Sequence, residues 1–588
     1  MDYSKICGVY AGLEGTSKGL EKTDILAGFL GEICEKPELI YLLQGRLFAD
    51  YDNRELGISI QLIIKAISRA AGIGENAVVD KFKELGDLGK VAEAVLGRKK
   101  KQISLFSGKL SVEKVMDNLR KIPTFEGKGT VDFKVGLIVE LLHSASAEEA
   151  KYVVRTVLGD LKIGVGSGIL RDAIVVYCFS PKDIEDKKVC VKAVQEAYDK
   201  ATDFAEVFSR ACDDSLEKIK LKPGKPVKVM LFPKAKDVED AFRIVGRPAA
   251  FEYKYDGFRV MVNKTEDRGQ RTEDRVKVFT RRLEEVTNQF PEIVEYVDKN
   301  VDGDSFILDC EVVGFDAGTG EYTDFQAISQ RIKRKHGISE MRSKLPIELT
   351  VFDVIYYNGD SLIEVPFSER RALIEKVVRE DEKRIVLAKQ IVTSDDSEVE
   401  KFYEEALSEG QEGLMGKSLS APYKPGARVG YAVKLKPEDN DFDLVITGAE
   451  WGTGKRAGWL TSFDIACRNS VDDGGQMTDD SGELLEIGKV STGLKEIPSE
   501  SGDGQRVTGD GVTYKEMTDM LEKLVVEVDG RKIKVRPEIV VSVQYQNVQR
   551  SPTNSSGFAL RFPRILRLRG DRGVDDIATL DEVERESN

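Results

Sequence analysis

The sequence has few of the residues that hold structural zinc. Its 588 residues include only two histidines and seven cysteines, and no cysteine pair is spaced as Cys-x-x-Cys. The cysteines are Cys7, Cys34, Cys178, Cys190, Cys212, Cys310 and Cys467. A structural zinc site needs thiolate or imidazole ligands in closely spaced motifs. We therefore expect neither a zinc site nor a disulfide framework.

The chain also lacks long apolar runs and a targeting segment. Residues 1–14 do not combine a basic stretch with an apolar one, and no run is long enough to span a bilayer. Charged residues make up 32% of the chain and the net charge is −14. A field of this sign repels polyanions, so contact with nucleic acid requires local basic patches. We expect a cytoplasmic protein without membrane contact.

The first third of the chain has the pattern of a helical domain. Apolar residues recur at three-to-four spacing in Leu56–Ala71 and in Lys134–Leu142. Ser146 and Glu149 have the spacing of a capping box at the start of another helix. We predict an all-α domain over residues 1–218.

The pattern changes to short β runs after a segment rich in proline, glycine and lysine, Lys220–Lys228. Strands such as Phe251–Tyr255 and Phe306–Phe315 alternate with helical pieces, which predicts an α+β domain over residues 219–437. Beyond it the strands are short and the turns are rich in glycine and aspartate. That pattern suits a small closed β-barrel over residues 438–588.

A lysine among aromatic residues and acids is the strongest candidate for chemistry. Lys254 lies two residues after Glu252 and two before Asp256, and Arg259 follows a glycine turn. A free lysine titrates near ~10.4, so it needs desolvation or neighbouring cations to act as a nucleophile at neutral pH. A strand over residues 250–255 that runs into an Asp-Gly turn explains the same residues without chemistry.

Three later segments supply possible partners. Leu308–Glu311 ends an apolar strand in two acids, which would be costly to bury unless paired or bound to metal. Glu412–Lys417 imitates part of a P-loop, but Gln411 stands where the first glycine is required and no helix can follow, so we reject a P-loop. Val433–Lys436 alternates and directs two lysines to one face of a strand, although a solvated edge would look the same.

Six ordered segments together resemble the motifs of covalent nucleotidyltransferases, and the chain is similar over nearly its whole length to archaeal ATP-dependent DNA ligases. The segments are Lys254–Arg259, Thr280–Arg282, Leu308–Glu311, Val351–Asp353, Glu412–Lys417 and Val433–Lys436. The resemblance implies a helical DNA-binding domain, an adenylation domain and an OB-fold domain. It also implies ATP-dependent sealing of nicks in duplex DNA during replication, repair and recombination.

In that family the lysine of the first motif takes AMP from ATP, which assigns the nucleophile to Lys254. The resemblance implies that Glu252 reads the adenine amino group and that Phe352 stacks on the base. Glu311 and Arg259 would hold the ribose.

The cations that the resemblance assigns to the phosphates are Arg281, Arg428, Lys434 and Lys436. Glu311 and Glu412 would position Mg²⁺, with Mn²⁺ as an alternative. Arg282 replaces an asparagine frequent in the family, and Ala432 replaces a tryptophan. Neither change removes a reacting group.

Two further segments suggest partners. Lys162, Gly164 and Gly166 precede a helix and resemble a family loop that contacts the backbone of duplex DNA, although close helix packing would also explain the glycines. Gln102, with Leu105 and Phe106, resembles the hook by which archaeal ligases dock on a PCNA-type sliding clamp. The same pair could instead fold back on the helical domain. We expect a monomer that binds nicked double-stranded DNA.

The last basic segment, Arg561–Arg572, resembles the ligase motif that closes over outgoing pyrophosphate.

The residues favour a DNA ligase over three other functions. A capping guanylyltransferase shares the Lys-x-Asp-Gly motif but would not need the large helical domain. An NAD-dependent ligase would carry a cysteine zinc site. A single-strand binder without activity would not need Lys254, Glu311, Glu412 and Lys434 together.

Overall fold

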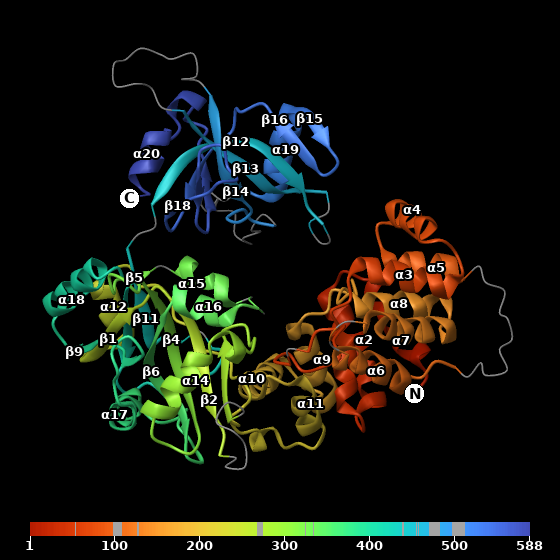
Figure 1. Ribbon diagram of the computed structural model, residues 1–588, viewed down its shortest axis with the longest axis horizontal. Helices are drawn as coiled ribbons and strands as arrows, with labels where there is room; N and C mark the ends of the chain where they lie inside the picture. The colour runs from red at the N-terminus through yellow and green to blue at the C-terminus, as the bar shows by residue number, and fades with distance from the viewer. Residues whose placement is uncertain are drawn as a thin grey trace. The chain divides into compact units, whose positions relative to one another are not determined.

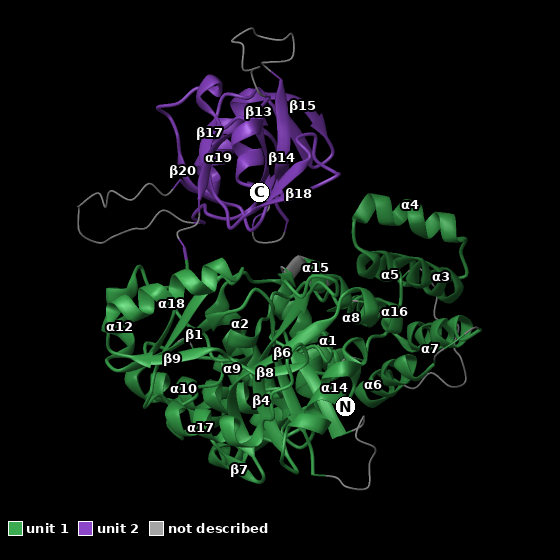
Figure 2. Ribbon diagram, turned by 60° about the vertical axis from the view of Figure 1, so that its left-hand side comes forward, with its two compact units in different colours: residues 1–436 green, residues 437–588 purple. Residues whose placement is uncertain are grey.

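The structure is a computed structural model that divides into two compact units, residues 1–436 and 437–588 (Figure 2). It describes residues 1–52, 54–97, 109–125, 127, 129–266, 275–323, 325–332, 334, 336–427, 429–437, 440–453, 456, 458–469, 483–496 and 512–587. None of the helices in these ranges is long and apolar enough to cross a bilayer.

The first part of unit 1 is helical, as predicted. Its α-helices are α1 (Tyr3–Glu14), α2 (Gly19–Leu30), α3 (Ile60–Ala71), α4 (Glu75–Leu85), α5 (Leu88–Leu96), α6 (Val112–Lys121), α7 (Val131–Ser144), α8 (Ala147–Val157), α9 (Ser167–Phe179), α10 (Ile184–Ala201) and α11 (Phe204–Cys212) (Figure 1). The capping box of Ser146 and Glu149 at the start of α8 is confirmed. Their apolar faces share one core.

The segment that follows α11 is held against that helix by ion pairs. Lys222 and Lys225 both form ion pairs with Glu206, at 2.7 and 3.0 Å. Helix α12 (Val238–Val245) then leads into strand β1 (Ala249–Lys254).

The remainder of unit 1 contains two β-sheets. The smaller sheet has the order β11-β10-β1-β9 and is antiparallel. Its other strands are β9 (Gln390–Thr393), β10 (Gly413–Ser418) and β11 (Ala432–Leu435). Residues 413–418 form this strand, so they are not a P-loop, which agrees with the sequence prediction.

The larger sheet of unit 1 has the order β3-β2-β4-β6-β7, with β5 paired to β4 and β8 paired to β6. Its strands are β2 (Phe258–Lys264), β3 (Val276–Thr280), β4 (Phe306–Phe315), β5 (Tyr322–Thr323), β6 (Ile347–Tyr357), β7 (Asp360–Ser361) and β8 (Ile385–Leu387). The two sheets are accompanied by α12 and by α14 (Pro291–Asn300), α15 (Phe325–Ile332), α16 (Ile338–Lys344) and α18 (Asp396–Ser408).

One crossover in this part was not predicted from the sequence. Helix α17 (Phe367–Val377) joins β6 to β8, and these two strands are parallel neighbours. A parallel pair requires such a crossover, because a tight hairpin reverses the chain. Helix α17 therefore returns alongside β6. Two of its arginines, Arg370 and Arg371, lie close to Asp353 and Glu252.

Unit 2 is rich in β-structure and has its own core. Its seven-stranded sheet contains β12 (Asp441–Trp451), β13 (Leu460–Arg468), β14 (Leu484–Val490), β15 (Val525–Asp529), β16 (Lys532–Val535), β17 (Val540–Gln544) and β20 (Arg564–Leu568). Two strands form a separate pair, β18 (Val548–Arg550) and β19 (Phe558–Leu560). Helices α19 (Tyr514–Leu521) and α20 (Leu580–Arg585) complete the unit.

Candidate active site

A cavity of about 720 Å³ lies between the two sheets of unit 1. Seven of the residues predicted to bind the nucleotide line it: Glu252, Lys254, Arg259, Arg281, Glu311, Phe352 and Lys434. They come from segments that span residues 252–434, and the fold brings these segments together around one cavity.

Strand pairing places an acid beside Lys254. Strands β1 and β10 pair antiparallel with Lys254 opposite Gly413, and the Glu412 N–H donates to the Lys254 carbonyl oxygen at 2.8 Å. The Lys254 Nζ forms an ion pair with the Glu412 carboxylate. Gly413 has φ +130°, and a Cβ there would collide with the Leu435 carbonyl oxygen, so glycine is required at this position.

The second glycine of the site, Gly257, allows the turn after β1 to approach β4. A Cβ on Gly257 would collide with the Val312 carbonyl oxygen and would lie 3.0 Å from Glu311 Cγ. This close approach brings the turn of the first motif against Glu311. The glycine is needed here for space, and not for an unusual backbone angle.

Burial raises the pKa of Glu311 to about 8. The charges of Lys254 and Arg259 oppose this rise, and those of Asp309 and Glu412 reinforce it. A carboxyl in such surroundings gains from a nearby cation. Mg²⁺ is commonly held by one or two carboxylates together with substrate phosphates and water, so Glu311 and Glu412 suit a magnesium site that a nucleotide completes.

Arg259 is held by Asp309, an acid of the segment Leu308–Glu311 whose role was not predicted from the sequence. Its Nε donates to Asp309 Oδ1 at 2.8 Å and its Nη1 donates to the Met230 carbonyl oxygen at 2.7 Å. Tyr423 donates to Asp309 Oδ2 at 2.7 Å. Asp309 is fully buried, and its pairing with Arg259 compensates the cost of burying it. Arg259 still borders the cavity.

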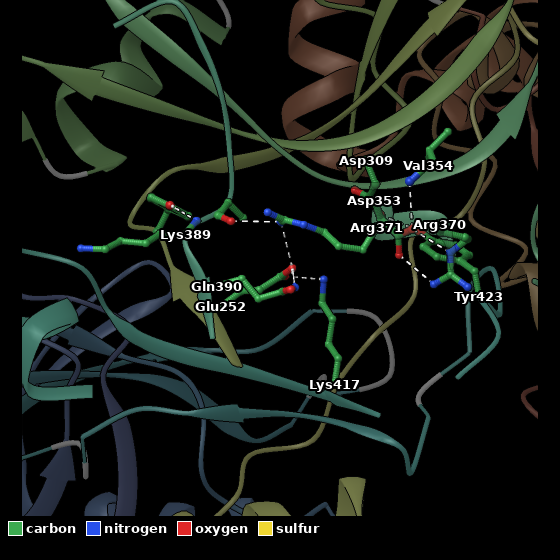
Figure 3. Close-up of polar contacts among 12 residues, drawn as sticks. Glu252, Asp309, Asp353, Val354, Arg370, Arg371, Lys389, Gln390, Lys417 and Tyr423 are labelled. Carbon is green, nitrogen blue, oxygen red and sulfur yellow. Dashed lines mark hydrogen bonds and ion pairs between the residues drawn. The ribbon is translucent and has the colours of Figure 1, made fainter. Parts of the chain in front are cut away.

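Glu252 also lines the cavity and is 2% exposed. Its Oε1 accepts from Gln390 Nε2 at 2.8 Å, and Lys417 Nζ lies 2.5 Å from Oε2 (Figure 3). The Lys417 ammonium also lies 4.9 Å from the centre of the Phe352 ring. An acidic acceptor and an aromatic face thus lie at the same end of the cavity. The contribution of Gln390 was not predicted, because no local pattern marks it.

The remaining predicted nucleotide ligands are Lys436 and Arg428. Lys436 directly follows β11 and is not among the described residues that line the cavity. Arg428 lies outside the described residues. Arg282 and Ala432, the two departures from the family pattern, differ in position: Arg282 lines the cavity and Ala432 is buried in β11.

The predicted DNA-contacting loop immediately precedes α9, whose N-cap is Gly166. Lys162 and Gly164 both have positive φ, at +58° and +62°. The Lys162 ammonium lies 3.2 Å from Asp87, and the buried Lys22 donates to the Ile163 carbonyl oxygen. The loop therefore has a fixed backbone at a helix N-terminus, which is suited to binding a phosphate. Lys22 was missed because it comes from α2.

The predicted clamp hook, Gln102, Leu105 and Phe106, lies outside the described residues. Most of the basic segment Arg561–Arg572 forms β20 and the turn that follows it. Arg564 and Arg567 are exposed, whereas Arg569 forms an ion pair with Asp443 at 2.8 Å. The segment therefore contains both exposed and structurally engaged arginines.

Comparison with known protein families covers most of the chain. The family model described as "DNA ligase N terminus" matches residues 2–175. The model described as "ATP dependent DNA ligase domain" matches residues 229–436, which include every residue that lines the cavity. The model described as "ATP dependent DNA ligase C terminal region" matches residues 456–572.

Similar proteins match the chain over its full length. The DNA ligase of Nanoarchaeum equitans is 43% identical and is matched over 100% of this chain and 98% of its own length. The DNA ligase of Thermococcus fumicolans is 40% identical, with 99% and 98% covered. The solved structure named Pmar-Lig_PreS3 shares the fold, with a TM-score of 0.53, 15% identity and 96% and 99% covered. The chain, with its helical N-terminal region, central adenylation domain and β-rich C-terminal domain, belongs to the family of ATP-dependent DNA ligases.

Proposed function

We propose that this protein seals nicks in double-stranded DNA with ATP, in replication, repair and recombination. Lys254 Nζ attacks the α-phosphorus of ATP, forming an N–P bond while pyrophosphate leaves. AMP then passes to the 5′-phosphate at a nick, and the 3′-hydroxyl displaces AMP to form the phosphodiester bond. The observation that carries the proposal is the location of Lys254, in a cavity lined by an acid, an aromatic ring and cations from separate strands.

The side chains of the cavity divide between binding and charge stabilisation. At one end, Glu252 accepts from the adenine amino group and Phe352 stacks on the base. Arg259, with its guanidinium oriented by Asp309, and Glu311 bind the ribose.

At the reacting end, fixed cations stabilise the charge that develops on the phosphates during transfer. These cations are Arg281, Arg428, Lys434 and Lys436. Glu311 and Glu412 would hold Mg²⁺ or Mn²⁺, which would supply further positive charge at the phosphates. Glu412 also orients the Lys254 amine through their ion pair.

The domain boundaries and partners follow from the same proposal. Residues 1–218 bind DNA and residues 219–437 carry out adenylation. Residues 438–588 form an OB-fold, which is supported by the seven-stranded antiparallel sheet of unit 2, in which β12 pairs with β13, β16 and β17. Lys162, Gly164 and Gly166 contact DNA phosphates from the N-terminus of α9. Gln102, Leu105 and Phe106 dock on a sliding clamp, and the protein acts as a monomer.

One assay tests the activity directly. The purified protein is incubated with ATP, GTP or NAD⁺, each labelled so that a transferred nucleotide carries the label, and the protein is examined for an acid-labile adduct. We expect a lysyl adduct from ATP. Subsequent addition of nicked duplex should discharge the adduct and yield a sealed strand. An adduct formed from GTP alone, or no adduct with any nucleotide, would refute the proposal.

A further inference from the structure

Two consecutive arginines of α17 point in different directions, Arg370 toward Asp353 and Arg371 toward Glu252 (Figure 3). Arg370 donates through Nε and Nη2 to the two carboxylate oxygens of Asp353, at 2.7 and 2.9 Å. Asp353 directly follows Phe352 in β6. Arg371 points the other way, and its Nη1 lies 3.6 Å from Glu252 Oε1. One turn of helix thus contacts Glu252 and the residue next to Phe352.

The Glu252 carboxylate is held from three elements. Gln390 at the start of β9 donates to Oε1 at 2.8 Å, Arg371 of α17 faces the same oxygen, and Lys417 of β10 pairs with Oε2 at 2.5 Å. The side chains of Arg371, Lys417 and Glu252 are 12%, 5% and 2% exposed. A carboxylate that is buried and contacted on both oxygens cannot rotate without losing a charged partner, so its orientation is fixed before any ligand enters.

Arg371 is itself anchored. Its Nη1 donates to the Ala388 carbonyl oxygen at 3.0 Å and its Nε donates to Glu375 at 2.7 Å. The 3.6 Å separation from Glu252 is long for a hydrogen bond, so Arg371 acts on the carboxylate mainly through its charge. Gln390 supplies the hydrogen bond and therefore the direction. The two residues have complementary effects on one carboxylate.

The orientation matters because adenine and guanine present opposite groups at purine position 6. Adenine carries an amino group that donates, and guanine carries an oxo group that accepts. An ionised carboxylate only accepts. A carboxylate held next to cations therefore suits the 6-amino purine and leaves a 6-oxo group facing another acceptor, which costs binding free energy.

We propose that Arg371 and Gln390 are positioning residues that set the preference for a 6-amino purine nucleotide by holding the Glu252 carboxylate in place. Neither residue needs to contact the nucleotide. This inference rests on the proposed function, since it concerns the nucleotide that adenylates Lys254.

The test measures self-adenylation with ATP and with purine riboside triphosphate, which lacks the 6-amino group. In the wild type, ATP should be preferred. For Arg371→Met and Gln390→Leu, the KM for ATP should rise about tenfold, the loss expected for one hydrogen bond to a charged group. The KM for purine riboside triphosphate should change little and kcat should be retained, because the interaction is made equally in the ground and transition states. Arg371→Lys should recover part of the preference.

Arg384→Met is the matched control, because Arg384 forms an exposed ion pair with Asp381 in the same part of the chain. It should leave both KM values unchanged. If Arg371→Met and Gln390→Leu weakened both nucleotides equally, or changed only the melting temperature, their role would be confined to holding α17 and β9, and the inference would be wrong. If the wild type took no label from ATP, the proposed function would itself fail, and the inference with it.

Discussion

At the scale of single residues, the acids around Lys254 define what a substitution there can change. The amine forms an ion pair with Glu412, and its charge lowers the cost of burying Glu311. Removing the positive charge would leave two acids near each other with less compensation. A substitution that tests the nucleophile must therefore keep the charge.

Lys254→Arg meets that condition. Arginine stays protonated at neutral pH and has no free electron pair for attack on phosphorus. We expect self-adenylation with α-labelled ATP to be abolished, while the affinity for nicked duplex stays within about twofold, because the residues that we propose to contact DNA are unchanged. Lys376→Arg, on the exposed face of α17, is the control and should label normally. Persistent labelling of the Lys254→Arg protein would assign the nucleophile elsewhere.

Glu311 predicts a pH dependence of stability. Its pKa in the folded protein is about 8, above the ordinary value of 4.5, so the folded state binds a proton more tightly than the unfolded chain. The free energy of unfolding that Glu311 contributes through this proton is fully present below pH 4.5. It is lost as pH rises towards 8. Glu311→Gln stays neutral and avoids this loss.

The melting temperature of Glu311→Gln, measured in EDTA, should therefore exceed that of the wild type increasingly from pH 5 to pH 8. Adenylation should fall in the same variant, because a proposed metal and ribose ligand is gone. Such a trade between stability and activity is usual where an acid is buried for function. A constant difference in melting temperature across this pH range would contradict the assignment.

At the scale of elements, local patterns could be predicted from the sequence, whereas pairings between distant residues could not. The capping box of Ser146 and Glu149 was predictable because its two residues lie three apart. Strand β4 was predicted with its observed bounds, Phe306–Phe315, because its apolar residues are a local signal. The two acids were expected at the end of the strand, but Asp309 and Glu311 lie in its middle. The contact of Gln390 with Glu252 spans 138 residues and begins on a four-residue strand, so no window of the sequence contains it.

In the candidate site too, residues in local motifs were predicted and residues that depend on distant pairings were not. Lys254, Glu311 and Glu412 were found because short motifs surround them. Arg371 was not found, because α17 shows as an ordinary helix and its function depends on the β6–α17–β8 crossover. A crossover is fixed by which strands become neighbours, and that depends on packing of the whole domain.

Strand β20 carries a prediction of its own. Arg564 and Arg567 are exposed on it, and its pairing with β17 is part of the main sheet of unit 2. Deleting the chain from Arg561 onward would remove β20 and leave β17 with an open edge. We therefore replace the two arginines instead, with Arg564→Ala and Arg567→Ala together.

If these arginines act on the outgoing pyrophosphate, the double variant should lose about a hundredfold in adenylation from ATP. Sealing of a nick that already carries AMP should be retained. Arg569→Ala is the contrasting variant, because it breaks the ion pair with Asp443 and should lower the melting temperature. Equal loss of both activities in the double variant at an unchanged melting temperature would show that the segment serves DNA binding and not the first step.

At the scale of the whole molecule, a net charge of −14 repels DNA, which we propose that this protein binds. Long-range electrostatics opposes the encounter, and the Lys162 loop, whose ammonium is paired with Asp87, acts only at short range. A partner that already encircles DNA would raise the local concentration of the protein at nicks. The clamp hook of Gln102, Leu105 and Phe106 would provide this link.

Leu105→Ala with Phe106→Ala should therefore weaken binding to the clamp by about tenfold or more, since two apolar anchors are removed. At moderate salt, where direct attraction to DNA is screened, the variant should lose the stimulation of sealing by the clamp. Unstimulated sealing should not change, because the cavity around Lys254 lies elsewhere in the chain. The matched control is Leu20→Ala with Phe133→Ala, two apolar side chains that are 72% and 65% exposed on α2 and α7. A Leu105→Ala, Phe106→Ala protein that bound the clamp normally but melted at a lower temperature would place both side chains in the core, and the proposed link to the clamp would have to lie in another segment.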